Sequence, residues 1–123
     1  MPTQNRKILA VVEDLFFTVK INEAAKRAGL PIEFVKSETD VLERAKSGPA
    51  LIIIDFNNPS IDTLGLVRKL KSDEATRAIS VIGYLSHVQG ELKQQAQEAG
   101  CDMVLARSAF SQNLPLILKR HAA

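Results

Sequence analysis

The chain has 123 residues, 46% of them hydrophobic and 24% charged, with a formal net charge of +2 at pH 7. This length and balance are typical of one soluble globular domain, and the scattered basic residues argue against nucleic-acid binding. No apolar stretch is long enough to cross a bilayer, and Cys101, the only cysteine, cannot form an internal disulfide. We therefore expect a single domain over residues 1–123 that is cytoplasmic and has neither nucleic acid nor a membrane as a partner.

Strand-like and helix-like segments alternate five times along the chain. Short runs rich in branched apolar residues predict strands at residues 8–12, 32–35, 51–55, 80–85 and 103–106. Apolar residues at three- and four-residue spacing predict helices at residues 17–28, 40–46, 62–71 and 91–99. Ser111 can cap a last helix, in which Pro115 would lie in the first turn, where proline is tolerated.

The run from Leu51 to Ile54 indicates a strand buried on both faces, and it stops at a carboxylate, Asp55. Strands that alternate with helices of these lengths predict a parallel sheet with helices on both faces. Five such units in a chain of this size favour an α/β fold of the flavodoxin-like type, with the strand order 2-1-3-4-5.

Acidic residues end the two strands that flank the switch point of this order, where such sheets bind their ligands. The first strand runs into Glu13 and Asp14 and the third ends at Asp55, so we expect the three carboxylates to share one crevice. Clustered carboxylates suit Mg²⁺, and an aspartate can form an acyl phosphate. Ser86 and Arg107 follow the fourth and fifth strands and are candidates to hold phosphoryl oxygens.

The segment that begins at Asp55 shows the pattern Asp, three residues, Pro, two residues, Asp, a small residue, Leu. It resembles the phosphoacceptor segment of response-regulator receiver domains (CheY-like), and the likeness in order and spacing extends over roughly residues 7–121. The resemblance implies a single receiver of two-component phosphorelay signalling in which Asp55 accepts a phosphoryl group. It also implies that the backbone carbonyl of Asn57 joins Glu13, Asp14 and Asp55 around Mg²⁺.

The partners follow from the same resemblance. A sensor histidine kinase or a phosphotransfer protein would supply the phosphoryl group, and a downstream protein that the sequence does not identify would receive the signal by direct contact. We expect a monomer or a weak homodimer. Such a chain is not an enzyme, apart from catalysing its own aspartyl phosphorylation and dephosphorylation.

The sequence departs from the receiver pattern at four places. Receivers usually end the first strand with two adjacent acids, and those places fall on Val12 and Glu13. Their lysine after the fifth strand is replaced here by arginine, which keeps the charge but has a broader, planar head. Leu85, one residue before Ser86, stands in place of the switch hydroxyl of receivers. Val104 stands in place of their switch aromatic residue.

Two alternatives remain. The first is a pseudo-receiver, a protein-binding module of the same fold that works without phosphorylation, in which Arg107 would form a permanent ion pair with Asp55. The second is a small flavin-binding protein of the same topology. It is disfavoured because the loop after the first strand, from Glu13 to Phe16, is acidic and apolar and would repel a phosphate.

Overall fold

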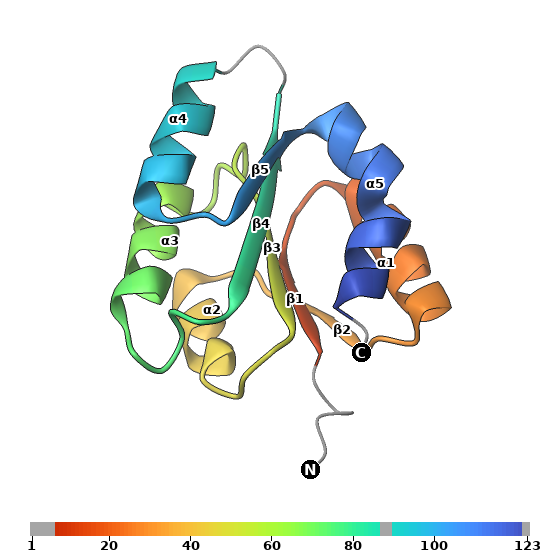
Figure 1. Cartoon of the computed structure of the whole chain (residues 1–123), viewed down its shortest axis with the longest axis horizontal. Helices are drawn as coiled ribbons and strands as arrows, with labels where there is room; N and C mark the ends of the chain where they lie inside the picture. The colour runs from red at the N-terminus through yellow and green to blue at the C-terminus, as the bar shows by residue number, and fades with distance from the viewer. Residues whose placement is uncertain (1–6, 87–89, 122–123) are drawn as a thin grey trace.

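The computed structural model describes residues 7–86 and 90–121. In these ranges five parallel strands form one sheet in the order β2-β1-β3-β4-β5, and helices cover both faces (Figure 1). The elements, in chain order, are β1 (Ile8–Val11), α1 (Leu15–Ala28), β2 (Ile32–Phe34), α2 (Glu38–Ala45), β3 (Leu51–Asp55), α3 (Thr63–Ser72), β4 (Ser80–Leu85), α4 (Gly90–Ala99), β5 (Met103–Ala106) and α5 (Arg107–Arg120). The predicted flavodoxin-like, CheY-like fold and its strand order are confirmed.

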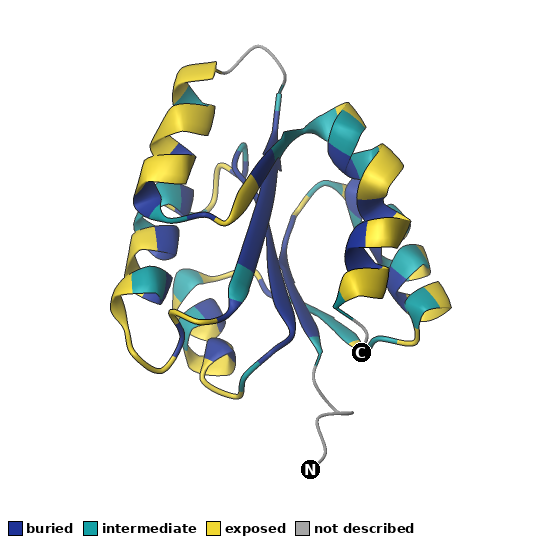
Figure 2. Ribbon diagram, viewed as in Figure 1, coloured by how far each residue is buried: buried dark blue, intermediate teal, exposed yellow. Residues whose placement is uncertain are grey.

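The sheet separates two apolar layers. Helices α1 and α5 cover one face, and α2, α3 and α4 cover the other (Figure 1). Side chains alternate between the layers along β3: Ile53 packs on the α1 and α5 side, whereas Ile52 and Ile54 pack on the opposite side. Figure 2 shows the result as buried strands between helices whose outer surfaces are exposed. The central strand is therefore buried on both faces, as the sequence predicts.

Short polar side chains begin three of the helices. The side chains of Asp14, Ser37 and Asp62 accept backbone N–H bonds from the first turns of α1, α2 and α3, at 3.3, 3.1 and 3.1 Å. Gly29 ends α1 in the left-handed conformation, with φ of 73°. The cap at Asp14 fixes this carboxylate where the chain leaves β1.

The strand register brings the functional candidates to one edge. All strand pairs are parallel, so their carboxyl ends share the upper edge of the sheet in Figure 1. Asp55 is paired with Tyr84 on the neighbouring strand, and Leu85 with Ala106. Residues that follow β1, β3, β4 and β5 therefore meet at this edge, which we call the carboxyl edge.

The last helix differs from its prediction. It starts at Arg107, directly after β5, and not at Ser111, so Pro115 lies inside the helix. An interior proline removes one hydrogen bond and costs about 3 kcal/mol relative to alanine. The helix forms nevertheless because its apolar side is buried against α1 and the sheet, through Phe110, Leu114, Ile117 and Leu118. Packing thus outweighs local propensity here.

Among the described residues, no helix combines the length and the apolar character that a membrane span requires.

Gly83 of β4 leaves room for the ring of Phe56. A Cβ atom added at Gly83 would lie 2.0 Å from Phe56 Cε2 and 3.0 Å from the Ile54 carbonyl oxygen. We expect Gly83→Ala to lower the free energy of unfolding by about 1–3 kcal/mol, because the buried ring has to move. Urea unfolding followed by circular dichroism measures this loss. Gly90→Ala is the control, since nothing lies within 4 Å of its added Cβ; equal stability of the two variants would contradict the prediction.

Candidate functional site

Asp55 is a buried carboxylate at the carboxyl edge. It ends β3, is only 6% exposed, and its Oδ1 accepts the backbone N–H of Asn57 at 2.8 Å. Burial raises the pKa of Asp55, and the nearby charges of Asp14 and Glu13 add to this effect. The Asn57 N–H and the charge of Arg107 oppose it, but the pKa remains above its ordinary value. A carboxylate kept out of water beside a cation is a candidate for chemistry.

The two acidic residues after β1 both lie near Asp55, but they differ in exposure and in their partners. Glu13 is exposed, and its charge acts on Asp55. Asp14 caps α1 and forms an ion pair with Arg107, Oδ2 to Nη2, at 2.8 Å. Burial alone would raise the pKa of Asp14, but hydrogen bonds from Phe17, Arg107 and Phe16 outweigh it and lower the pKa. The structure thus brings the predicted acids to one edge, with Asp14 engaged by Arg107.

Arg107 is held from two sides. Besides its ion pair with Asp14, its guanidinium carbon lies 4.9 Å from the centroid of the Phe17 ring, within cation–π range. The ion pair between Arg107 and Asp55 that the pseudo-receiver alternative expects is wrong for this structure: in the described residues Arg107 pairs with Asp14. The reason is that Asp14 is fixed by its cap at the start of α1, directly beside the start of α5.

Asn57 joins the loop after β3 to the end of β4. Its side-chain oxygen accepts the backbone N–H of Ser86 at 3.0 Å, so Ser86 lies at the carboxyl edge beside the Asp55 loop. Leu85 is 2% exposed and packs on the side of the sheet covered by α2, α3 and α4, as does Val104. The leucine and valine in the switch positions are therefore ordinary core residues.

Val12 occupies one of the two positions after the first strand at which receivers usually have an acid. It is 3% exposed and packs in the layer with α1 and α5, where a carboxylate would be costly. Within residues 7–86 and 90–121, no three His, Cys, Asp or Glu side chains are grouped so that they could hold a metal ion. The oxygens near Asp55 are still of the hard type that Mg²⁺ prefers, and this ion keeps several waters, so it needs few protein ligands. The carboxylate oxygens of Glu13 and Asp55 are donors of the kind that Mg²⁺ takes.

Sequence reasoning missed an aromatic cluster beneath these charges. The ring of Tyr84 stacks against both Phe17 and Phe110, with centroid distances of 4.6 and 4.7 Å and interplanar angles of 25° and 26°, and the centroids of the two phenylalanine rings are themselves 6.1 Å apart. Phe17 also supports Arg107. The available signal was the strand pattern itself, because Tyr84 directly precedes Leu85 and must point to the opposite side of the sheet.

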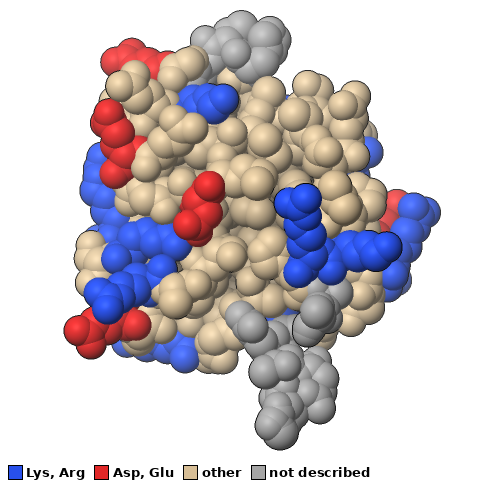
Figure 3. Space-filling view, viewed as in Figure 1, with Lys and Arg blue, Asp and Glu red and all other residues tan. Residues whose placement is uncertain are grey.

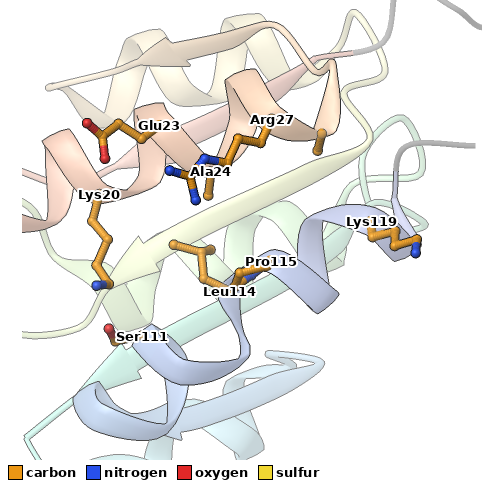
Figure 4. Close-up of a pocket in the computed structure, with 9 residues that line it drawn as sticks. Lys20, Glu23, Ala24, Arg27, Ser111, Leu114, Pro115 and Lys119 are labelled. Carbon is orange, nitrogen blue, oxygen red and sulfur yellow. The ribbon is translucent and has the colours of Figure 1, made fainter.

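The remaining surface offers features away from Asp55. A groove of about 570 Å³ runs between α1 and α5 (Figure 4). Its lining includes Lys20, Glu23, Arg27, Leu114 and Lys119, but none of the predicted site residues. On the face shown in Figure 3, basic side chains lie in separate groups and form no continuous band.

In comparisons by sequence, no protein-family model matches the chain, and neither does any curated protein. Solved structures do resemble it. A response regulator from Hahella chejuensis superposes with a TM-score of 0.82 at 18% identity, over 94% of this chain and 94% of that one. The receiver domain of the sensor histidine kinase PA1611 from Pseudomonas aeruginosa, described with a magnesium ion in its active-site cleft, gives 0.80 at 19% identity, over 96% and 98%.

The chemotaxis response regulator CheY4 of Vibrio cholerae gives a TM-score of 0.78 at 20% identity, covering 94% of this chain and 98% of that one. These identities are low, so the likeness establishes the fold. It agrees with the strand order and the two helical layers described above. The chain therefore has the fold of CheY-like response-regulator receiver domains.

Proposed function

We propose that this chain is a response-regulator receiver that accepts a phosphoryl group on Asp55 and signals by contact with another protein. One observation carries the proposal: a buried carboxylate ends the central strand, with acids from the loop after β1 and a cation from the start of α5 acting on its charge. The receiver fold of the solved relatives supports it. A sensor histidine kinase or phosphotransfer protein is the proposed donor.

The chemistry is a phosphoryl transfer between two side chains. One carboxylate oxygen of Asp55 forms a bond to phosphorus while the bond between phosphorus and the donor's histidine nitrogen breaks, and the histidine keeps that electron pair. The raised pKa of Asp55 makes its oxygen more basic, which favours attack once the carboxylate is ionised. The Asn57 N–H already donates to Oδ1 and holds the carboxylate in one orientation.

Mg²⁺ is the proposed cofactor, held by Asp55, Glu13 and the backbone carbonyl of Asn57. When bound, the ion neutralises charge on the phosphoryl oxygens. Arg107 supplies the second positive charge, and Ser86 lies at the same edge. The Nη2 atom of Arg107 is already bonded to Asp14, so the phosphoryl group either takes the other N–H donors of the guanidinium or competes with this carboxylate.

The pseudo-receiver remains the second candidate, and the Arg107–Asp14 ion pair favours it. A cation that is held by a neighbouring carboxylate and an aromatic ring is stable without any phosphoryl group. In that case the chain would present one permanent surface to its partner. The following experiments separate the two functions.

Phosphorylation is tested directly with acetyl phosphate and Mg²⁺. We expect a mass increase of one phosphoryl group in the wild-type chain and none in Asp55→Asn, because Asp55 is the one buried carboxylate at this edge among the residues that the structure describes. Intact-protein mass spectrometry at neutral pH gives the readout. Asp62→Asn, a change at an exposed helix cap, is the control and should be modified normally. If the wild-type chain stays unmodified at a saturating concentration of acetyl phosphate, the phosphorylated receiver is excluded and the pseudo-receiver is retained.

Asp14 could act as the ion-pair partner of Arg107 or as a ligand of Mg²⁺, and the variant Asp14→Asn distinguishes these two roles. Asparagine keeps the helix cap but removes the ion pair, which is partly exposed, so we expect a stability loss under about 1 kcal/mol. We also expect Glu13→Gln to weaken Mg²⁺ binding about tenfold and Asp14→Asn to weaken it much less. Isothermal titration calorimetry measures both. The opposite order of affinities would assign the ligand role to Asp14.

Asp55 should reduce stability near neutral pH. The pKa of Asp55 is raised in the fold above its ordinary value of 3.8, which applies to the unfolded chain. Ionisation of Asp55 therefore costs more free energy in the folded chain than in the unfolded chain. Replacement by Asn should therefore raise the melting temperature in metal-free buffer. This gain should appear as the pH rises above 3.8 and level off above the folded pKa. Thermal melts at several pH values check it, and a gain that is the same at every pH would show that the cause is not ionisation.

A further inference from the structure

Tyr84 carries a buried hydroxyl group with no hydrogen-bond partner in the described part of the chain. The residue is 0% exposed, and its oxygen is fully buried. Such a group lowers the free energy of unfolding, because folding removes its hydrogen bonds to water and provides no protein partner. Phenylalanine would fill the same space without this cost. The hydroxyl therefore calls for an explanation other than core packing.

The strand register places Tyr84 next to Asp55. The two residues are paired across β3 and β4, and paired residues of parallel strands point to the same side of the sheet. That side is the layer with α1 and α5, to which the Tyr84 ring belongs. Because the ring packs against both Phe17 and Phe110, its rotation is restricted.

Charged groups of the candidate site act on this hydroxyl. Burial raises the pKa of Tyr84 first, the negative charges of Asp55 and Asp14 raise it further, and Arg107 opposes them. The hydroxyl therefore keeps its proton at any physiological pH and can act only as a donor toward an anion. The anion closest at hand in the register is the side chain of Asp55.

The opposite side of β4 offers no such donor. Leu85 occupies the next position and packs in the other layer, so its side chain has no hydroxyl to give. A phosphoryl group on Asp55 would extend this side chain and add three acceptor oxygens at the carboxyl edge. It would offer acceptor oxygens on the side of the sheet to which Tyr84 also points.

We propose that Tyr84 is a phosphoryl-sensing residue of this site: its hydroxyl donates a hydrogen bond to a phosphoryl oxygen on Asp55, on the α1 and α5 side of the sheet. The inference rests on the proposed function at Asp55. No bond other than the hydrogen bond is made, and the proton stays on the tyrosine. Because the ring is stacked on Phe17, which also supports Arg107, occupation of Asp55 would be felt by α1 and α5 through this stack.

The sequence makes the idea easy to test, because Tyr84 is the only tyrosine and there is no tryptophan. Near-ultraviolet absorbance and fluorescence near 300 nm therefore report on this hydroxyl alone. Beryllofluoride with Mg²⁺, a stable mimic of the aspartyl phosphate, is the probe. We expect it to shift the tyrosine spectrum of the wild-type chain and to leave that of Asp55→Asn unchanged.

The variant Tyr84→Phe keeps the ring stack and removes only the oxygen. We expect it to be at least as stable as the wild type without ligand, and to bind beryllofluoride about tenfold more weakly, as the loss of one charge-assisted hydrogen bond implies. After phosphorylation with acetyl phosphate, Tyr84→Phe should also lose its phosphoryl group faster than the wild type. Calorimetry and time-resolved mass spectrometry measure the two effects, with circular dichroism to confirm folding.

The outcomes separate this inference from the function beneath it. If the wild-type chain neither binds beryllofluoride nor accepts a phosphoryl group, the proposed function fails and the inference fails with it. If Asp55 is modified normally but Tyr84→Phe binds the probe as tightly as the wild type, or the tyrosine spectrum does not respond, only the role of Tyr84 is overturned.

Discussion

The burial of β3 on both faces is the constraint on which the rest of this molecule depends. Four fully buried apolar residues leave the strand no alternative to the centre of the sheet, with strands on either side and a helical layer on each face. Since all neighbours are parallel, their carboxyl ends lie together, and the first polar residue of β3 is carried to that edge. Asp55 is buried there because the strand that bears it is buried.

The charges at this edge are arranged around Asp55 but are not all directed at it. Asp14 is fixed by its helix cap, and it attracts Arg107, which also rests on the ring of Phe17. The guanidinium therefore has two partners before any ligand arrives. To bind Arg107 in place of Asp14, an anion would have to attract the guanidinium more strongly than this partly exposed carboxylate does, and a doubly charged, multidentate anion is of that kind.

Pattern and periodicity were sufficient to predict the strand order, both layers and the positions of Glu13, Asp14 and Asp55 along the edge. Two features needed three-dimensional information. The start of α5 was missed because the prediction took Pro115 as a first-turn residue, whereas burial of Phe110 and Leu114 carries the helix through it. The partner of Arg107 was missed because side chains from three elements compete for one cation, and spacing along the chain does not rank them.

The departures from the receiver pattern divide between the two layers of the structure, and Leu85 and Val104 pack with α2, α3 and α4. Val12 and Tyr84 both belong to the layer with α1 and α5, and Arg107 lies against Phe17 of the same layer. Where a receiver has a second acid after the first strand, this chain has apolar packing, and beside it a buried tyrosine hydroxyl that this packing leaves without a partner. If Asp55 is the phosphoacceptor that we propose, the donor nearest to it along β4 is Tyr84, and α1 and α5, which pack against the same aromatic cluster, would be the helices that respond to its occupation.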